Sequence, residues 1–146
     1  MSIAHYVARI EELCFRPFPA EHGPSDVGHS GPGHHVAALG TSHGMPGGDP
    51  AERAVTVEQY EKDRDALFEI LARRWGLTAP YNLQTLLLRT EREEIPEPWA
   101  SLSARARVAW VWEVEGTGRW VAVAVADQDE TDEVQLLAVV TETGPP

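Results

Sequence analysis

The sequence predicts an α+β fold in which two N-terminal helices, joined by a long segment rich in glycine, proline and histidine, pack on an antiparallel β-meander of three to four strands. Two stretches with apolar residues at three- and four-residue steps predict the helices. Three later runs of β-branched and aromatic residues, separated by short links, predict the meander. We therefore expect an N-terminal helix over residues 1–16, a flexible linker over 17–55 and an α+β domain over 56–146.

Each predicted helix combines an apolar stripe with a start signal. In residues 2–15, Ser2 is placed to cap the first turn. In residues 56–75, Thr56 and Gln59 fit the capping box, in which two side chains satisfy free backbone N–H groups. We expect the apolar side of helix 56–75 to cover one face of the sheet.

The composition of residues 17–55 sets them apart from the rest of the chain. They hold eight of the twelve glycines, six of the eleven prolines and five of the six histidines. A stretch of this kind gains little from burial and loses much backbone entropy on ordering. For this reason we predict a linker here and no part of the sheet.

The predicted meander consists of residues 108–115, 119–126 and 134–141. Short links between consecutive strands require antiparallel neighbours. The run 119–126 is apolar on both faces, so we place it centrally with a cover on each side. Helix 56–75 is one cover, and the other is helix 2–15, a second copy of the chain in a homodimer, or a partner.

The run of three adjacent leucines in residues 82–91 fits either a buried strand or a short helix. Both flanking stretches contain proline, which breaks either kind of element. We predict a strand, because an antiparallel series follows it in the chain, and it would be the fourth strand of the sheet.

Residues 56–146 contain the runs RWG, EEIPEPWASLSA, GRWVAVAVADQD and LLAVVTETGPP. These runs resemble small uncharacterised actinobacterial α+β proteins, for which no activity is established. The resemblance implies that residues 56–146 form one α+β domain. It implies no activity, and it does not include the histidine-rich segment.

The charge of the chain indicates which classes of partner it can bind. The formal net charge is −11, which opposes binding to nucleic acid or to an anionic membrane surface. The charge is concentrated in residues 108–146, where Arg119 is the one basic side chain among eight acidic ones. An acidic surface of this kind suits a protein partner with a basic surface.

The sequence indicates a reducing cytoplasm as the compartment. Cys14 is the single cysteine, so the chain has no internal disulfide and no multi-cysteine zinc site. The N-terminus has neither the basic region nor the long apolar run of a signal peptide. No stretch approaches the ~20 apolar residues of a membrane span.

The histidines raise the alternative of a metal-binding protein. The candidate ligands are His29, His34, His35 and His43. They lie among glycines and prolines, whereas zinc ligands are usually held on fixed elements at short spacing. Adjacent His34 and His35 would also point apart in an extended chain.

We find no catalytic pattern and expect no cofactor. The glycines of the segment lack the spacing and the lysine of a phosphate-binding loop. Cys14 lies on the apolar stripe of its helix, which is typical of a core residue. The acidic run from Asp127 lacks the glycine and glutamate that a calcium loop needs at its sixth and twelfth positions. The chain is therefore expected to be a binding protein more than an enzyme.

We expect a non-enzymatic, inhibitor- or immunity-like adaptor that meets a basic partner through its acidic C-terminal third. A small-molecule carrier, with a tryptophan-lined pocket near Trp110 and Trp120, is a further alternative. The residues expected to carry partner binding are Glu113, Glu115, Asp127, Asp129, Glu130, Asp132 and Glu133.

Overall fold

The computed structural model describes residues 2–146 and shows an α+β fold built on one antiparallel sheet. The strands are Gly23–Pro24 (β1), Gly28–Gly31 (β2), His34–Thr41 (β3), Pro80–Asn82 (β4), Ala106–Val114 (β5), Arg119–Ala126 (β6) and Gln135–Thr141 (β7). The helices are Ile3–Leu13 (α1), Pro50–Trp75 (α2), Leu83–Arg89 (α3) and Trp99–Arg105 (α4). The seven strands follow the order β1-β2-β3-β7-β6-β5-β4.

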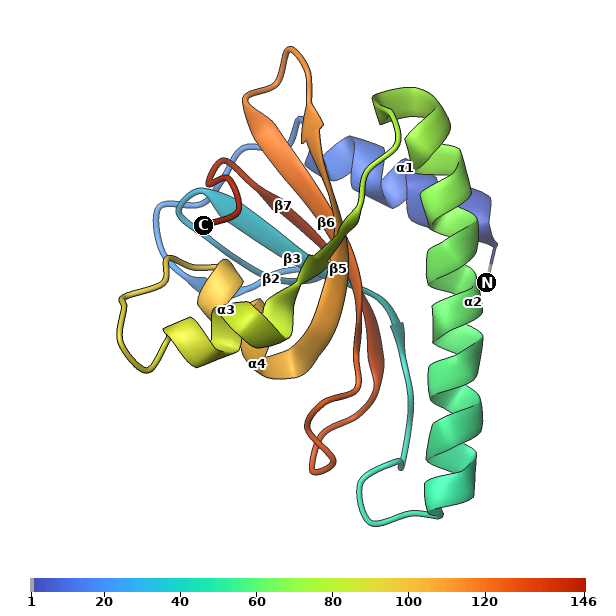
Figure 1. The fold of residues 1–146 in the computed structure, drawn as a ribbon. Coiled ribbons are helices and arrows are strands. Elements are labelled where there is room, and N and C mark those ends of the chain that lie inside the picture. Colours follow the sequence, from blue (N-terminus) through green and yellow to red (C-terminus); the bar gives the residue numbers. More distant parts are fainter. Residues whose placement is uncertain (1) are drawn as a thin grey trace.

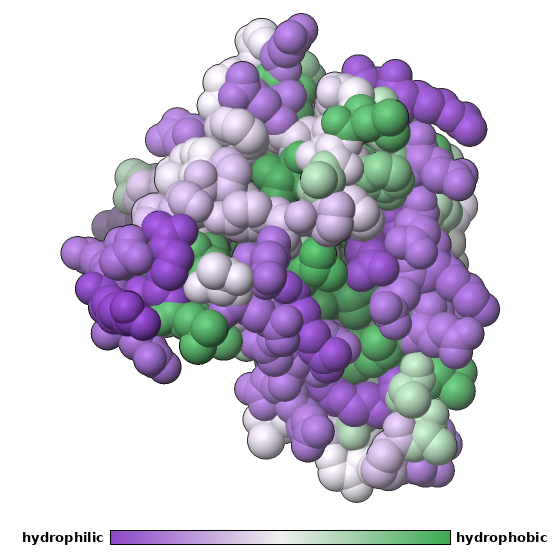
Figure 2. Space-filling view, viewed as in Figure 1, coloured by the Kyte–Doolittle hydropathy of each residue, from purple (hydrophilic) through white to green (hydrophobic). Residues whose placement is uncertain are grey.

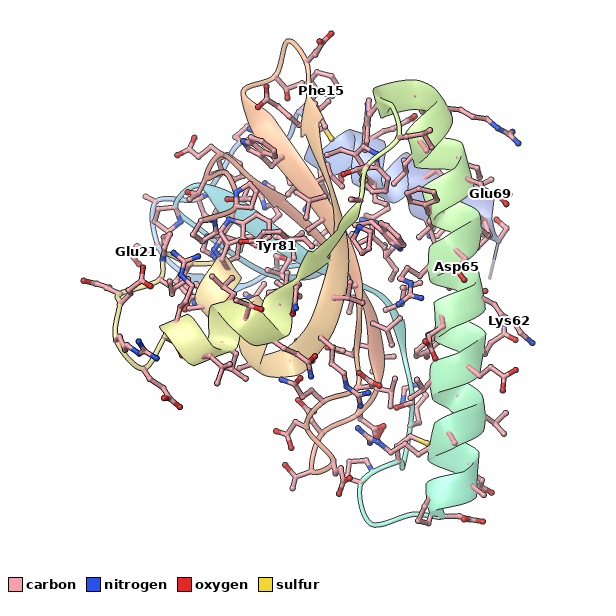
Figure 3. All side chains as sticks on the ribbon, in the orientation of Figure 1. Phe15, Glu21, Lys62, Asp65, Glu69 and Tyr81 are labelled. Atoms are coloured by element: carbon pink, nitrogen blue, oxygen red, sulfur yellow. The ribbon has the colours of Figure 1, made fainter. Side chains whose placement is uncertain are left out.

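Two helices cover each face of the sheet, so the core has two layers (Figure 1). On one face, α1 and α2 pack on the side chains of β5, β6 and β7 that include Val121 and Leu136. On the other face, α3 and α4 bury Leu86 and Trp99 against Ala122 and Leu137. The labelled Lys62, Asp65 and Glu69 of α2 point away from the sheet (Figure 3). This arrangement gives β6 the interior, doubly covered position that its apolar sequence predicts. The second cover is α3 and α4, however, and not helix 2–15, which packs on the same face as α2.

The sheet has more strands than the sequence predicts, because the segment expected to be a linker contributes β1, β2 and β3. The turn between β2 and β3 is Pro32-Gly33, and Gly33 has a φ of +82°, which favours glycine. β3 then pairs with β7 from His34 to Thr41. The backbone hydrogen bonds of this ladder outweigh the unfavourable composition, so the expected boundary at residue 55 does not separate the sheet from residues 17–55.

The prediction of a strand over residues 82–91 is wrong. Asn82 ends β4 and caps α3, since its Oδ1 accepts hydrogen bonds from the N–H groups of Gln84 at 2.9 Å and Thr85 at 3.2 Å. Within the leucine run, Leu86 is buried and Leu88 is 65% exposed, which suits a helix with one apolar side. The helix cap therefore decides between the two structures that the leucines allow.

α2 begins six residues before the predicted start. Asp49 is its N-cap and accepts a hydrogen bond from Ala51 N–H at 2.9 Å, and Pro50 occupies the first helical position. Thr56 does not cap the helix, because its hydroxyl donates to the carbonyl of Glu52 one turn earlier. The cap predicted for the first helix is confirmed, with Ser2 Oγ accepting from His5 N–H at 3.3 Å.

The space-filling view shows hydrophilic residues over most of one face, with apolar residues visible between α2 and the sheet (Figure 2). Within residues 2–146, no helix has both the length and the apolar character needed to cross a membrane.

Candidate functional site

A cavity of about 280 Å³ lies between α4 and the β2–β3–β7 part of the sheet. We call it the histidine cavity. Its apolar walls come from β3, β7 and the start of α4, and its polar groups come from three histidines, Glu97, Ser101 and Arg105. The lining residues are His22, His29, His34, Val36, Glu97, Pro98, Ser101, Leu102, Arg105, Leu137 and Val139.

Three imidazole rings meet at one side of this cavity. His29 is on β2, His34 begins β3, and His22 comes from the segment before β1. The ring centroid of His22 lies 5.4 Å from that of His29 and 5.8 Å from that of His34. A Cβ on Gly31 would lie 2.9 Å from Cδ2 of His22 and 3.0 Å from Cε1 of His34. Glycine at position 31 therefore leaves the room that the rings occupy.

His29 and His34 favour their uncharged form at neutral pH, because their pKa values are lowered. Burial lowers the pKa of His29, and the neighbouring His22 and Arg105 lower it further, whereas Glu97 opposes this. Burial also lowers the pKa of His34, with His22 and His29 as the next causes. An uncharged imidazole offers one hydrogen-bond donor and one acceptor, so the cavity presents polar edges without a fixed positive charge there.

Glu97, in the turn before α4, and Ser101 and Arg105 on α4 cross the cavity at four-residue steps. Oε2 of Glu97 accepts a hydrogen bond from Ser101 N–H at 3.1 Å, which fixes the carboxylate near the start of the helix. Arg105, at the other end, donates to Gln135 and lies 3.8 Å from a carboxylate oxygen of Asp132. The cavity therefore has an acidic end and a basic end.

The four histidines predicted as metal ligands do not form one site. His29 and His34 line the cavity, but His35 points to the opposite face of the sheet, and His43 follows the far end of β3. Within residues 2–146, no group of three or more histidine, cysteine, aspartate or glutamate side chains is arranged to hold a metal ion. The structure thus brings together two of the four, with His22 as the third ring.

His35 has a structural role, because its ring joins the segment after α1 to the sheet. Its Nε2 lies 3.2 Å from the carbonyl oxygen of Arg16, so this nitrogen donates and Nδ1 is left to accept from Ser30 Oγ at 2.7 Å. The ring also lies 4.8 Å from that of Phe18. Burial lowers the pKa of His35, in agreement with a neutral ring that joins residues 16–18 to the sheet.

The acidic residues predicted to bind a partner lie at opposite ends of the sheet. Val114 pairs with Arg119 at one end of the β5–β6 ladder, and Ala106 pairs with Ala126 at the other. Glu113 and Glu115 lie at the first end, and the turn 127–133 follows the second. A strand of this length spans about 25 Å. The seven carboxylates therefore do not share one surface.

Most carboxylates of the turn already have partners within the chain. Glu133 accepts hydrogen bonds from Ser42 Oγ and Gly44 N–H, each at 2.6 Å. Asp129 accepts from the backbone and the hydroxyl of Thr131. The remaining pairs are Asp127 with Arg107 at 3.4 Å and Asp132 with Arg105, and Glu130 is exposed. Binding of a basic partner by these residues stays a prediction.

The tryptophans do not line the cavity. Trp110 lies on the α2 face, 4.5 Å from the ring of Phe68, and Trp120 lies on the opposite face. Trp99, the first residue of α4, is fully buried, and its Nε1 donates to the carbonyl of Thr143 at 2.9 Å. A single pocket next to Trp110 and Trp120 is therefore not formed.

Sequence analysis missed His22, Glu97, Ser101 and Arg105 as members of one site. His22 lies outside the two strands, Ser101 and Arg105 belong to a short helix that the sequence did not predict, and Glu97 lies in the turn just before that helix. The four-residue steps from Glu97 to Arg105 would have placed the three on one side of a helix. The sequence offers no signal that this side faces β2 and β3.

No family model matches the chain, and neither the curated proteins nor the solved structures include a match. The proposals below therefore rest on the chemistry of the residues alone.

Proposed function

We propose that this protein is a non-enzymatic binding protein whose histidine cavity takes a small, largely apolar molecule with a polar edge. The observation that carries the proposal is the composition of the cavity. Val36, Leu102, Leu137 and Val139 form apolar walls, while the uncharged imidazoles of His29 and His34 provide donors and acceptors. A concave, mainly apolar site with a few convergent polar groups is the usual form of a small-molecule site.

The size of the cavity supports this assignment. An apolar cavity of about 150 Å³ in another protein admits benzene. The histidine cavity has about 280 Å³, which is enough for a benzene ring with a short polar substituent. His34 and the apolar walls are buried, whereas His22, Glu97 and Ser101 are exposed and line the entrance. A ligand can therefore enter without unfolding of the sheet.

The hydrogen bonds of the cavity favour binding over catalysis. Glu97 contacts Ser101 through a hydrogen bond that the backbone N–H of Ser101 donates, and not through the Ser101 hydroxyl. A nucleophile needs its hydroxyl or thiol next to a base, and Cys14 is buried on the other face of the sheet. Burial raises the pKa of the Cys14 thiol to about 11, which keeps it protonated and unreactive.

Titration of ¹⁵N-labelled protein with benzyl alcohol tests the proposal. We expect saturable shifts of backbone amide signals from β2, β3 and α4. Ser101→Trp should block the entrance and abolish the shifts. Ala104→Trp is the matched control, because Ala104 is exposed on the same helix and does not line the cavity. Absence of saturable shifts in the wild type, or equal shifts in both variants, would contradict the proposal.

A further inference from the structure

Glu97 is the charged group of the histidine cavity that lacks an opposite charge. It takes part in no ion pair with the residues that the structure describes, 2–146. One carboxylate oxygen accepts from Ser101 N–H, and the other has no hydrogen-bond partner among the same residues. The charge of Arg105, in contrast, already faces Asp132 at 3.8 Å. The unbalanced charge of the cavity is therefore negative.

The other groups of the cavity are compatible with a positive ligand. The imidazoles of His22, His29 and His34 can each direct a nitrogen lone pair at a donor while they are uncharged. The apolar walls formed by Leu137 and Val139 lie beside these polar groups and suit an apolar body. The net charge of −11 attracts cations to the protein as a whole.

We propose that the histidine cavity binds a small organic cation, with an ammonium group at Glu97 and an apolar body against the β3 and β7 walls. This inference rests on the function proposed above and adds the charge of the ligand. An ammonium group offers three donors and no acceptor. It can therefore donate to the free oxygen of Glu97 and to an imidazole nitrogen at the same time, whereas a hydroxyl has one hydrogen to donate and a carboxylate has none.

Acidification should weaken binding of the cation. The groups that face the site are His22, His29, His34, Glu97 and Arg105. As the pH falls through the lowered pKa values of His29 and His34, these two rings take up protons, become cations next to the ligand and repel it. A neutral ligand of the same shape loses less affinity on acidification, since it does not carry a charge. The difference in affinity loss between the two ligands therefore measures the contribution of the ligand's charge.

Three probes of similar shape test the inference: benzylamine, benzyl alcohol and benzoate, titrated into the full chain and followed by amide shifts. At pH 7.5 we expect benzylamine to bind about three- to five-fold more tightly than benzyl alcohol, as for an exposed ion pair. Because burial lowers the pKa values of His29 and His34, this advantage should shrink progressively as the pH falls below the ordinary histidine value of about 6.5. Glu97→Gln should remove it at pH 7.5, because glutamine keeps an oxygen for Ser101 N–H and loses the charge. Glu94→Gln is the matched control, since Glu94 is exposed and outside the cavity.

The outcomes separate this inference from the proposed function. If benzyl alcohol binds at the cavity as tightly as benzylamine, or if benzoate binds most tightly, the cation assignment is wrong and the cavity remains a small-molecule site. If benzylamine keeps its advantage in Glu97→Gln, the assignment of the ammonium group to Glu97 is wrong. If no probe shifts the amides of the cavity, both the cation assignment and the proposed function fail.

Discussion

The Nε2 atom of His35 lies 3.2 Å from the carbonyl oxygen of Arg16, and this contact ties the chain between α1 and β1 to the third strand of the sheet. The guanidinium of Arg119 supports the same corner, because it donates to the carbonyls of Leu13 and Arg16. It also lies 3.9 Å from the ring centre of Phe18. Residues 14–18 are thus held by specific polar bonds, and His22 follows them into the cavity.

Replacement of His35 by alanine should destabilise the protein. The side chain is 1% exposed, and its loss leaves a cavity and an unpartnered Ser30 hydroxyl. We expect the free energy of unfolding to fall by about 2–4 kcal/mol. Urea unfolding measures this value. His5→Ala is the control, because His5 is exposed on α1 and should change stability by less than about 0.5 kcal/mol.

Stability should also decrease on mild acidification. The pKa values of His29, His34 and His35 are lowered in the folded protein, mainly by burial. The unfolded chain therefore binds more protons once the pH falls below the ordinary histidine value of about 6.5. We expect a lower free energy of unfolding at pH 5.5 than at pH 7.5, measured in urea. A flat profile between these values would contradict the account of neutral, buried imidazoles.

Glu133 should order the loop after β3 more than it should bind a partner. Its carboxylate accepts hydrogen bonds from Ser42 Oγ and from the N–H groups of Gly44 and Met45. We expect Glu133→Ala to accelerate amide hydrogen exchange at Gly44 and Met45. Glu130→Ala removes a neighbouring exposed carboxylate and should leave both rates unchanged. Equal rates in wild type and Glu133→Ala would show that these bonds do not hold the loop in solution.

The two indoles Trp99 and Trp110 should respond differently to replacement by phenylalanine. Nε1 of Trp99 donates to Thr143, which holds the C-terminal segment beside α4. We expect Trp99→Phe to lower the free energy of unfolding by about 1–3 kcal/mol, from the lost bond and volume. Nε1 of Trp110 is buried without a partner among the described residues, so Trp110→Phe should cost less. Thermal unfolding of the two variants, measured in parallel, provides the comparison.

Periodicity predicts the central part of this fold because burial there follows directly from the sequence. The strands β5, β6 and β7 and the helix α1 have clear apolar patterns, and each lies within two residues of its expected range. The edge of the sheet could not be predicted in the same way. β2 and β3 contain few large apolar residues. β3 is stabilised by pairing with β7, a contact between positions about one hundred residues apart, and β2 pairs with β3.

The candidate site was only partly predictable for the same reason. His29 and His34 belong to the predicted histidine set, and their rings lie on the same face because the Pro32-Gly33 turn fixes the register of β2 and β3. His22 and Glu97 join them through tertiary packing of a loop and of α4. The acidic residues predicted to bind a partner are close in the sequence but do not form one site. Some are separated from the others by the length of β6, and others are engaged in local hydrogen bonds.

Intermolecular nuclear Overhauser effects between benzyl alcohol and the protein test the central claim most directly, because they locate the bound ring. The account predicts cross-peaks from the ring protons to the methyl groups of Leu102, Leu137 and Val139, together with their loss in Ser101→Trp. Cross-peaks to other side chains only, or none at concentrations that saturate the amide shifts, would contradict the claim that the histidine cavity is the binding site.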